Sequence, residues 1–258
     1  MVQIAFRPRH RSYVSTISPI ARTAAAWLLT IIVVCGFLNS LGYAQVSVLT
    51  QNADTRRDAV YNNETILTPT SKIHKLFTIS LDSPVRGQAL IVSGVAGGPQ
   101  NILLATTSPN HTTGSTSAYG FNADTGAQLW HLSLGTSAAF STAAPVVDPN
   151  LGPHGALFVV IKDSTTNTNK LHAIDVLAGT ELAGSPVTIS ATTGGHTFDS
   201  AQENARPALL EVNGTIYTSF CHMTDSGTYH GWLMLLTDPS APKSCSVTES
   251  CDIQSWLA

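Results

Sequence analysis

The cysteine and histidine side chains are the ones in this sequence that could bind a transition metal. Cys221 and His222 are adjacent, and His230 follows eight residues later. A structural zinc site needs four convergent ligands at recognised spacings, and this group supplies neither. We therefore predict no metal site. We also assign no catalytic residue, because no acid–base pair stands out in the sequence.

Three cysteines lie beyond the N-terminal region, and two of them are close together. Cys245 and Cys251 are six residues apart in a serine-rich, turn-like stretch. In an oxidising compartment these two could close a small disulfide loop, while Cys221 would stay free or find a partner elsewhere.

The N-terminal segment has the layout of a secretory signal. Four arginines precede an apolar run of 15 residues, 24–38, and small residues follow in Gly42-Tyr43-Ala44. Gly42 and Ala44 would occupy the positions where a signal peptidase requires small side chains, which places the cut before Gln45. We predict that residues 1–44 are a signal peptide and that the protein is secreted, periplasmic or on the cell surface. The alternative is a single-pass membrane anchor, although the apolar run is short for one.

Charge excludes one class of partner. Without the four arginines of the N-terminal segment, nine Lys and Arg face 16 Asp and Glu, a net charge of −7. No basic patch remains that could neutralise phosphates, so we predict no binding to nucleic acid. A membrane is a partner only if the N-terminal segment is not cleaved.

An internal repeat indicates the fold. Residues 119–129 align without gaps on residues 172–182, an offset of 53. Each copy reads as a strand, a turn and a second strand. Gly126 and Gly179 fall where the turn needs a positive φ, and polar Asn122 and Asp175 fall where side chains can bond turn amides.

Further strand-like runs surround both copies of the repeat. Four short strands per unit at a period near 50 residues are typical of β-propeller blades. A two-layer sandwich also strings short strands between turns, but it gives no reason for a gap-free repeat at this offset. We predict an all-β fold, an incomplete β-propeller of about three four-stranded blades after an N-terminal hydrophobic segment. The expected strands are 88–95, 101–107, 143–148, 156–162, 207–214, 215–220 and 232–236.

The first copy resembles the repeat of pyrroloquinoline-quinone-type propellers. It contains Asp124-Thr125-Gly126, and Trp130 stands four residues beyond the glycine. In that family the tryptophan docks one blade against the next. The second copy keeps Asp175 and Gly179 but has Ala183 at the tryptophan position, which weakens the docking element there.

Three other stretches are similar to exported quinoprotein-like propeller proteins of bacteria. The similarity covers about 48–236, so the chain resembles the N-terminal part of such a protein. The stretches are Leu49-Thr50-Gln51-Asn52 with residues 63–69; Phe198-Asp199 with Gln202, Asn204 and residues 206–210; and Tyr229-His230-Gly231-Trp232.

The resemblance implies a fold and not an activity. Related quinone dehydrogenases use a carboxylate base, a calcium ion with acidic and amide ligands, and an aromatic platform, and none of these motifs is identifiable here. We predict a non-catalytic extracytoplasmic scaffold or binding module, part of a longer protein, with a glycan or a protein as its ligand and no cofactor. The alternative is a fragment of a quinone-dependent oxidoreductase, which would bind pyrroloquinoline quinone with calcium.

Three polar residues could belong to a binding site. Asp199, Arg206 and His230 flank blade strands, from which side chains can point into the central channel. The interpretation that we favour is structural, with these residues as hydrogen-bond partners in turns and between blades. The sequence divides into a signal segment, 1–44; a segment leading to the first blade, 45–83; the partial propeller, 84–242; and a divergent tail, 243–258.

Overall fold

The computed structural model describes residues 47–61, 70–109, 115–135, 139–224 and 230–237. The chain divides into two units, Met1–Ala44 and Gln45–Ala258, and all described residues belong to the second. The signal segment predicted at 1–44 and the tail at 243–258, with Cys245 and Cys251, lie outside the described residues.

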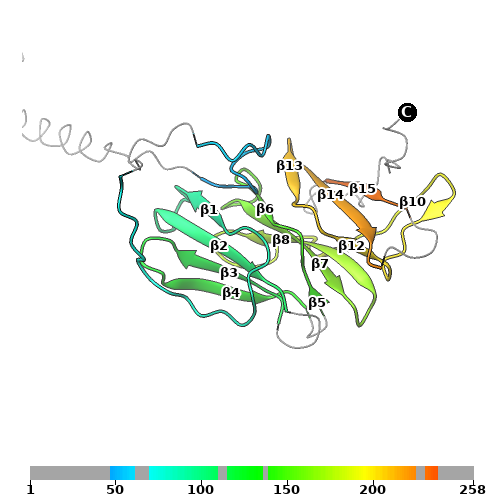
Figure 1. Ribbon diagram of the computed structural model, residues 1–258, viewed down its shortest axis with the longest axis horizontal. Coiled ribbons are helices and arrows are strands. Elements are labelled where there is room, and N and C mark those ends of the chain that lie inside the picture. The colour runs from blue at the N-terminus through cyan, green and yellow to red at the C-terminus, as the bar shows by residue number, and fades with distance from the viewer. Residues whose placement is uncertain (1–46, 62–69, 110–114, 136–138, 225–229, 238–258) are drawn as a thin grey trace, which may run out of the picture. The chain divides into compact units, whose positions relative to one another are not determined.

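The first sheet is a four-stranded antiparallel meander (Figure 1). Its strands are short runs rich in apolar residues, and in β1 buried and half-buried side chains alternate, as in a strand with two unequal faces. The strands follow one another in chain order as β1 (Leu90–Ser93), β2 (Asn101–Thr107), β3 (Ser117–Asn122) and β4 (Gln128–Ser133).

The second sheet repeats this order with a divided first strand. Both β5 (Ala139–Phe140) and β6 (Val146–Asp148) pair with β7 (Ala156–Asp163), which pairs with β8 (Thr168–Asp175) and then β9 (Val187–Thr188). Strand β7 is buried almost throughout because both of its faces meet other sheets.

The third sheet also begins with a divided strand. Both β12 (Glu203–Ala205) and β13 (Leu210–Val212) pair with β14 (Thr215–His222), which pairs with β15 (Trp232–Thr237). Within the described residues this sheet has no fourth strand. A short hairpin of β10 (Thr192–Thr193) and β11 (His196–Thr197) precedes it.

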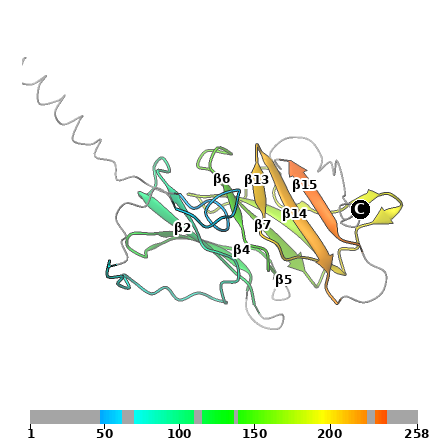
Figure 2. The ribbon, with the colours of Figure 1, turned by 45° about the horizontal axis from the view of Figure 1, so that its top comes forward.

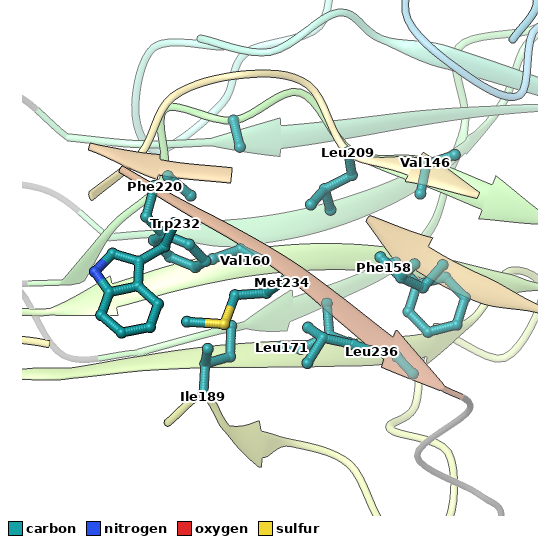
Figure 3. Packing of buried hydrophobic residues seen from close by; sticks show 14 of the residues in the cluster. Val146, Phe158, Val160, Leu171, Ile189, Leu209, Phe220, Trp232, Met234 and Leu236 are labelled. Carbon is teal, nitrogen blue, oxygen red and sulfur yellow. The ribbon is translucent and has the colours of Figure 1, made fainter. Parts of the chain in front are cut away.

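Two apolar cores join the three sheets face to face. One core lies between the first and second sheets and contains Leu104, Trp130 and Leu157. The other lies between the second and third sheets (Figure 2) and contains Phe158 and Leu171 of the second sheet and Trp232 of the third (Figure 3). Three consecutive antiparallel sheets that stack through their faces are blades, so the described part of the chain is all-β and forms three blades of a β-propeller. The predicted fold class is confirmed.

Trp130 links the first blade to the second. Its ring is 8% exposed, and its indole Nε1 donates a hydrogen bond to the carbonyl oxygen of Val176 at 2.9 Å. The ring lies against Gly120 of its own blade and Gly179 of the next, since a Cβ on either glycine would be 2.3 Å from a ring atom. Only glycine leaves room for the ring at these two positions.

The two repeated turns have the same hydrogen bonds. Asn122 Oδ1 accepts from the backbone N–H groups of Asp124 and Thr125, and Asp175 Oδ1 accepts from those of the equivalent residues, 177 and 178. The turn glycines have φ values of 76° for Gly126 and 67° for Gly179. These values lie in the left-handed region, which favours glycine.

The segment before the first blade ties all three blades together at their first strands. Val48 forms a two-bond bridge with Ile91, and the carbonyl oxygen of Leu49 accepts from the N–H of Val147 at 2.8 Å. Arg57 reaches the third blade, where its guanidinium donates to the carbonyl oxygens of residues 208 and 209 at 3.2 and 2.7 Å. No helix among the described residues has the length and apolarity to cross a membrane.

Candidate ligand-binding site

A pocket of about 430 Å³ opens between the first and second blades. This volume is within the range of small-molecule sites, which hold roughly 300 to 1,000 Å³. The end of β4 forms one wall, and β7 and β8 form the other. The lining residues are Ser133, Leu134, Gly135, Ile161, Asp163, Lys170, His172 and Pro186.

His172 is the most distinctive group in this pocket. Its side chain is 5% exposed, and its Nδ1 lies 2.6 Å from Glu181 Oε1. Because a carboxylate can only accept, Nδ1 carries the proton, and in the neutral ring Nε2 is then an acceptor. Ser185 donates its hydroxyl proton to the other oxygen of Glu181, which holds the carboxylate in place. Nε2 is buried and has no hydrogen-bond partner.

Lys170 places a positive charge on the same wall. It stands two residues before His172 on β8, so both side chains project from one face of the sheet. Within the described part of the chain its ammonium group forms neither an ion pair nor a hydrogen bond. The pocket thus contains one unpaired acceptor and one unpaired cation.

These groups are suited to binding and not to covalent chemistry. Ser185 donates to Glu181 and not to His172, so the three residues do not form the nucleophile–base–acid order of a catalytic triad. Leu134, Ile161 and Pro186 supply an apolar wall beside the polar groups. A pocket with an apolar wall and a few placed polar groups is the usual form of a small-molecule site.

A second, smaller pocket lies at the first strands of the blades. It holds about 270 Å³ between residues 47–55, β6 and Glu211 of β13. Each lining carboxylate already accepts backbone protons: Asp54 from residues 56 and 57, and Glu211 from Gly214. Thr50 Oγ1 is buried there without a partner. The backbone beside it includes Ala53 at a φ of 78°, a strained value for a residue with a Cβ.

The strongest electrostatic perturbation lies between the second and third blades. Lys162 and Glu203 are each 3% exposed, and the lysine ammonium donates to the carbonyl oxygens of Ser200 and Glu203. Burial, together with the nearby charge of Asp199, raises the pKa of Glu203 to about 7. Burial also lowers the pKa of Lys162. Neither buried residue is among those that line the two pockets.

No protein-family model matches the sequence, and no curated protein matches it. The solved structures that are similar at low level include the following three. An exo-β-1,3-galactanase from Phanerochaete chrysosporium is 12% identical with a TM-score of 0.35, and the match covers 59% of this chain and 32% of the galactanase chain. An endo-arabinase from Bacteroides thetaiotaomicron is 14% identical with a TM-score of 0.37, covering 69% of this chain and 66% of that one.

The third is an α-L-arabinofuranosidase from Clostridium thermocellum, 11% identical with a TM-score of 0.36; the match covers 75% of this chain and 70% of that chain. The chain therefore spans about a third of the galactanase and about two thirds of the endo-arabinase. At these scores the likeness carries no argument about activity, and the blade assignment rests on the sheets and cores described above.

The structure places the three polar residues named from the sequence in different surroundings. Asp199 lies in the turn before β12, where its charge acts on Lys162 and Glu203. Arg206 is exposed between β12 and β13. The ring of His230 lies 3.8 Å from that of His196 in the β10–β11 hairpin. They line neither pocket.

The quinone-dependent alternative would require metal binding, in the form of a calcium ion. Among the described residues, no group of three or more His, Cys, Asp or Glu side chains could hold a metal ion. Cys221 is half-buried, and its Sγ lies 3.9 Å from the carbonyl oxygen of Asn204.

Sequence reasoning missed His172 and Glu181, although both are in the aligned repeat. His172 aligns with Tyr119, which is buried in the first blade, and Glu181 aligns with Gln128. The sequence does contain a signal for this pair. A histidine stands at the position of a buried aromatic residue, and an acidic residue follows nine positions later, beyond the turn.

Proposed function

We propose that the protein is a non-catalytic, extracytoplasmic β-propeller binding module of the quinoprotein-like type. Its ligand is a glycan component, bound in the pocket between the first and second blades. The observation that carries this proposal is the buried Nε2 of His172, which Glu181 orients and which has no partner within the protein.

The ligand class follows from the two unpaired groups. A buried acceptor nitrogen left without a donor costs about 1 to 3 kcal/mol, and a ligand hydroxyl would remove that cost. The Lys170 ammonium suits a carboxylate, and the apolar wall suits the carbon skeleton of a small ring. A sugar that carries a carboxylate, of the uronic acid class, supplies all three features in one molecule.

The non-catalytic part of the proposal rests on where the perturbed groups lie. A catalytic acid or base needs a shifted pKa and access to substrate in a cleft. Glu203 and Lys162 have shifted pKa values, but they are buried between blades, and their polar groups hold the turn before β12. Their arrangement supports a structural role.

A binding titration tests the proposal. We expect D-glucuronate to bind the exported protein more tightly than D-glucose, with both followed by calorimetry and by the 15N signals of His172. Lys170→Met should weaken glucuronate binding by about tenfold or more, because it removes the only lysine or arginine among the described lining residues. His172→Gln should weaken both sugars, since it alters the acceptor that each hydroxyl group would use.

Lys72→Met is the matched control, because Lys72 is exposed and lies outside the pocket. Equal binding of glucuronate by Lys170→Met and the parent protein would overturn the assignment. So would an Nε2 signal of His172 that shows a bound proton in the free protein, since that nitrogen could not then accept from a hydroxyl.

A separate experiment tests the alternative function, a quinone-dependent oxidoreductase. The protein is mixed with pyrroloquinoline quinone and millimolar calcium, and dye reduction is followed with alcohols and sugars. Turnover above the protein-free rate would contradict the non-catalytic part of the proposal.

A further inference from the structure

The segment 72–81 lies along the first blade and pairs with no strand in the described part of the chain. Phe77, Ile79 and Leu81 are half-buried, whereas the residues between them are exposed, so the segment has the alternation of a strand. Its end is anchored where Asp82 accepts from the hydroxyl groups of residues 107 and 117 at 2.8 and 2.6 Å.

This segment is another copy of the outer strand of a blade. Residues 75–81, Lys-Leu-Phe-Thr-Ile-Ser-Leu, align without gaps on residues 128–134, Gln-Leu-Trp-His-Leu-Ser-Leu, which include β4. The offset is 53, the same as that between the two repeated turns. Phe77 therefore corresponds to Trp130.

The contacts of the two aromatic residues are also equivalent. A Cβ on Gly179 would lie 2.3 Å from the Trp130 ring, and a Cβ on Gly126 would lie 2.8 Å from the Phe77 ring. Gly126 and Gly179 are the same position of the repeated turn. Phe77 thus docks on the first blade as Trp130 docks on the second, and residues 75–81 occupy the place of the outer strand of a preceding blade.

That outer strand lacks the rest of its blade within the described chain. No backbone-to-backbone hydrogen bond involves residues 72–81 in the described part of the chain. Two large apolar side chains nearby are exposed, Ile73 by 86% and Leu76 by 80%. An unpaired strand with exposed apolar side chains is a template for pairing with another strand.

Among the described residues, the third blade lacks the strand that this segment would supply. In the first two blades the third strand is followed by a paired outer strand, β4 or β9. In the third blade, β15 occupies the third position and pairs only with β14 among the described residues. Leu233 and Leu235 of β15 are half-buried, on the face opposite the core that holds Trp232 and Met234.

We propose that residues 75–81 of one copy of this chain form the outer strand of the third blade of a second copy, and that the exchange is reciprocal. Two copies of three blades then close a ring of six, within the range of about four to eight blades that propellers use. The arrangement has two-fold symmetry, the commonest symmetry of homo-oligomers. It places a strand beside β15 and covers part of the Leu76 side chain, whose equivalent Leu129 in β4 is 38% exposed.

The repeat also predicts the register of the exchanged strand. In the first blade Ala118 on β3 is opposite Leu132 on β4, and Ile79 stands 53 residues before Leu132. Val147, Leu157 and Ile174 lie side by side on three strands of the second blade, as Glu211, Ile216 and Leu236 do in the third, so Ile174 corresponds to Leu236. Leu171 and Leu233, each three residues earlier on their strands, therefore correspond to each other. Leu171 also stands 53 residues after Ala118, so Leu233 corresponds to Ala118 of the first blade. Ile79 of one copy should therefore lie opposite Leu233 of the other.

Disulfide trapping tests this register. The four native cysteines are replaced by serine in the full chain, and Ile79→Cys is combined with Leu233→Cys. We expect a covalent dimer under mild oxidation, because opposite residues of paired strands have Cβ atoms about 4.5 to 5.5 Å apart. The control combines Ile73→Cys with Leu233→Cys, which is out of register and should remain uncrosslinked.

Two results would overturn the proposal. One is the absence of a covalent dimer for the 79–233 pair while the melting curve matches that of the cysteine-free parent. The other is equal trapping of the in-register and out-of-register pairs, which would show association without the proposed strand exchange.

Discussion

At the scale of single residues, Glu203 makes the stability of the fold dependent on pH. Its pKa is raised to about 7 in the folded protein by burial and by the charge of Asp199. The folded state therefore binds more protons than the unfolded state between the ordinary glutamate pKa and pH 7, and stability falls as pH rises through this window. We expect a loss of roughly 1 to 3 kcal/mol from pH 4.5 to 7.5, measured by denaturant unfolding.

Glu203→Gln is the matched test of this dependence. The amide keeps the shape of the side chain but cannot ionise, so the variant should lose most of the slope and be more stable than the parent at pH 7.5. An unchanged slope would show that another group titrates in this window.

The turn glycines predict a graded response to substitution. Gly179→Ala should cost several kcal/mol, because its Cβ would overlap the Trp130 ring and its φ is 67°. Gly195→Ala is the control: its φ is 81°, but nothing lies within 4 Å of the added Cβ. It should cost only about 1 kcal/mol. Equal melting temperatures for the two variants would refute the docking of Trp130 on this turn.

Trp130 itself should be among the most sensitive positions. Trp130→Ala removes the ring that fills the space between the first two blades and leaves the Val176 carbonyl without its donor. The expected loss is roughly 3 to 5 kcal/mol of unfolding free energy. A loss under about 1 kcal/mol in chemical denaturation would mean that the ring is not buried between blades.

At this scale the sequence predicted the turn chemistry but not the pocket. Asn122, Asp175 and the two turn glycines have local roles, which residue type and spacing express directly. His172 and Glu181 matter because a strand register places one beside the other and because two blades leave a space there. Neither condition can be read from a single sequence.

At the scale of elements, the leading segment should contribute to the stability of the third blade. Arg57→Ala removes two hydrogen bonds from a charged donor to the carbonyl oxygens of residues 208 and 209. We expect a loss of about 1 to 3 kcal/mol in guanidinium denaturation. Arg56→Ala, at an exposed neighbour, should be close to neutral. Similar losses for both would show that the segment does not tie the blades together.

The predicted strands agree with the structure where the repeat is strong and differ where it is interrupted. The run 156–162 matches β7 closely, because an apolar β-branched run buried on both faces has few alternatives. The run 143–148 became only the short β6, with β5 added before it, because the chain between them leaves the sheet. The segment 75–81 was not predicted as a strand, and within the described residues it has no backbone pairing that would define one.

At the scale of the whole molecule, the first prediction concerns export. If residues 1–44 are a signal peptide, N-terminal sequencing of exported protein should begin near Gln45, after the small residues Gly42 and Ala44. Finding Met1 on a membrane-bound product would replace secretion with anchoring.

The central claim is that the described residues form three blades whose end blades remain open in a single copy. Apolar side chains on such open ends favour association, and repeat arrays draw much of their stability from neighbour interfaces. The most direct measurement is size-exclusion chromatography with light scattering on the exported chain at micromolar concentration. The account predicts an assembly of more than one chain, with a mass of two chains if the outer strand is exchanged. A compact monomer that melts cooperatively would contradict it.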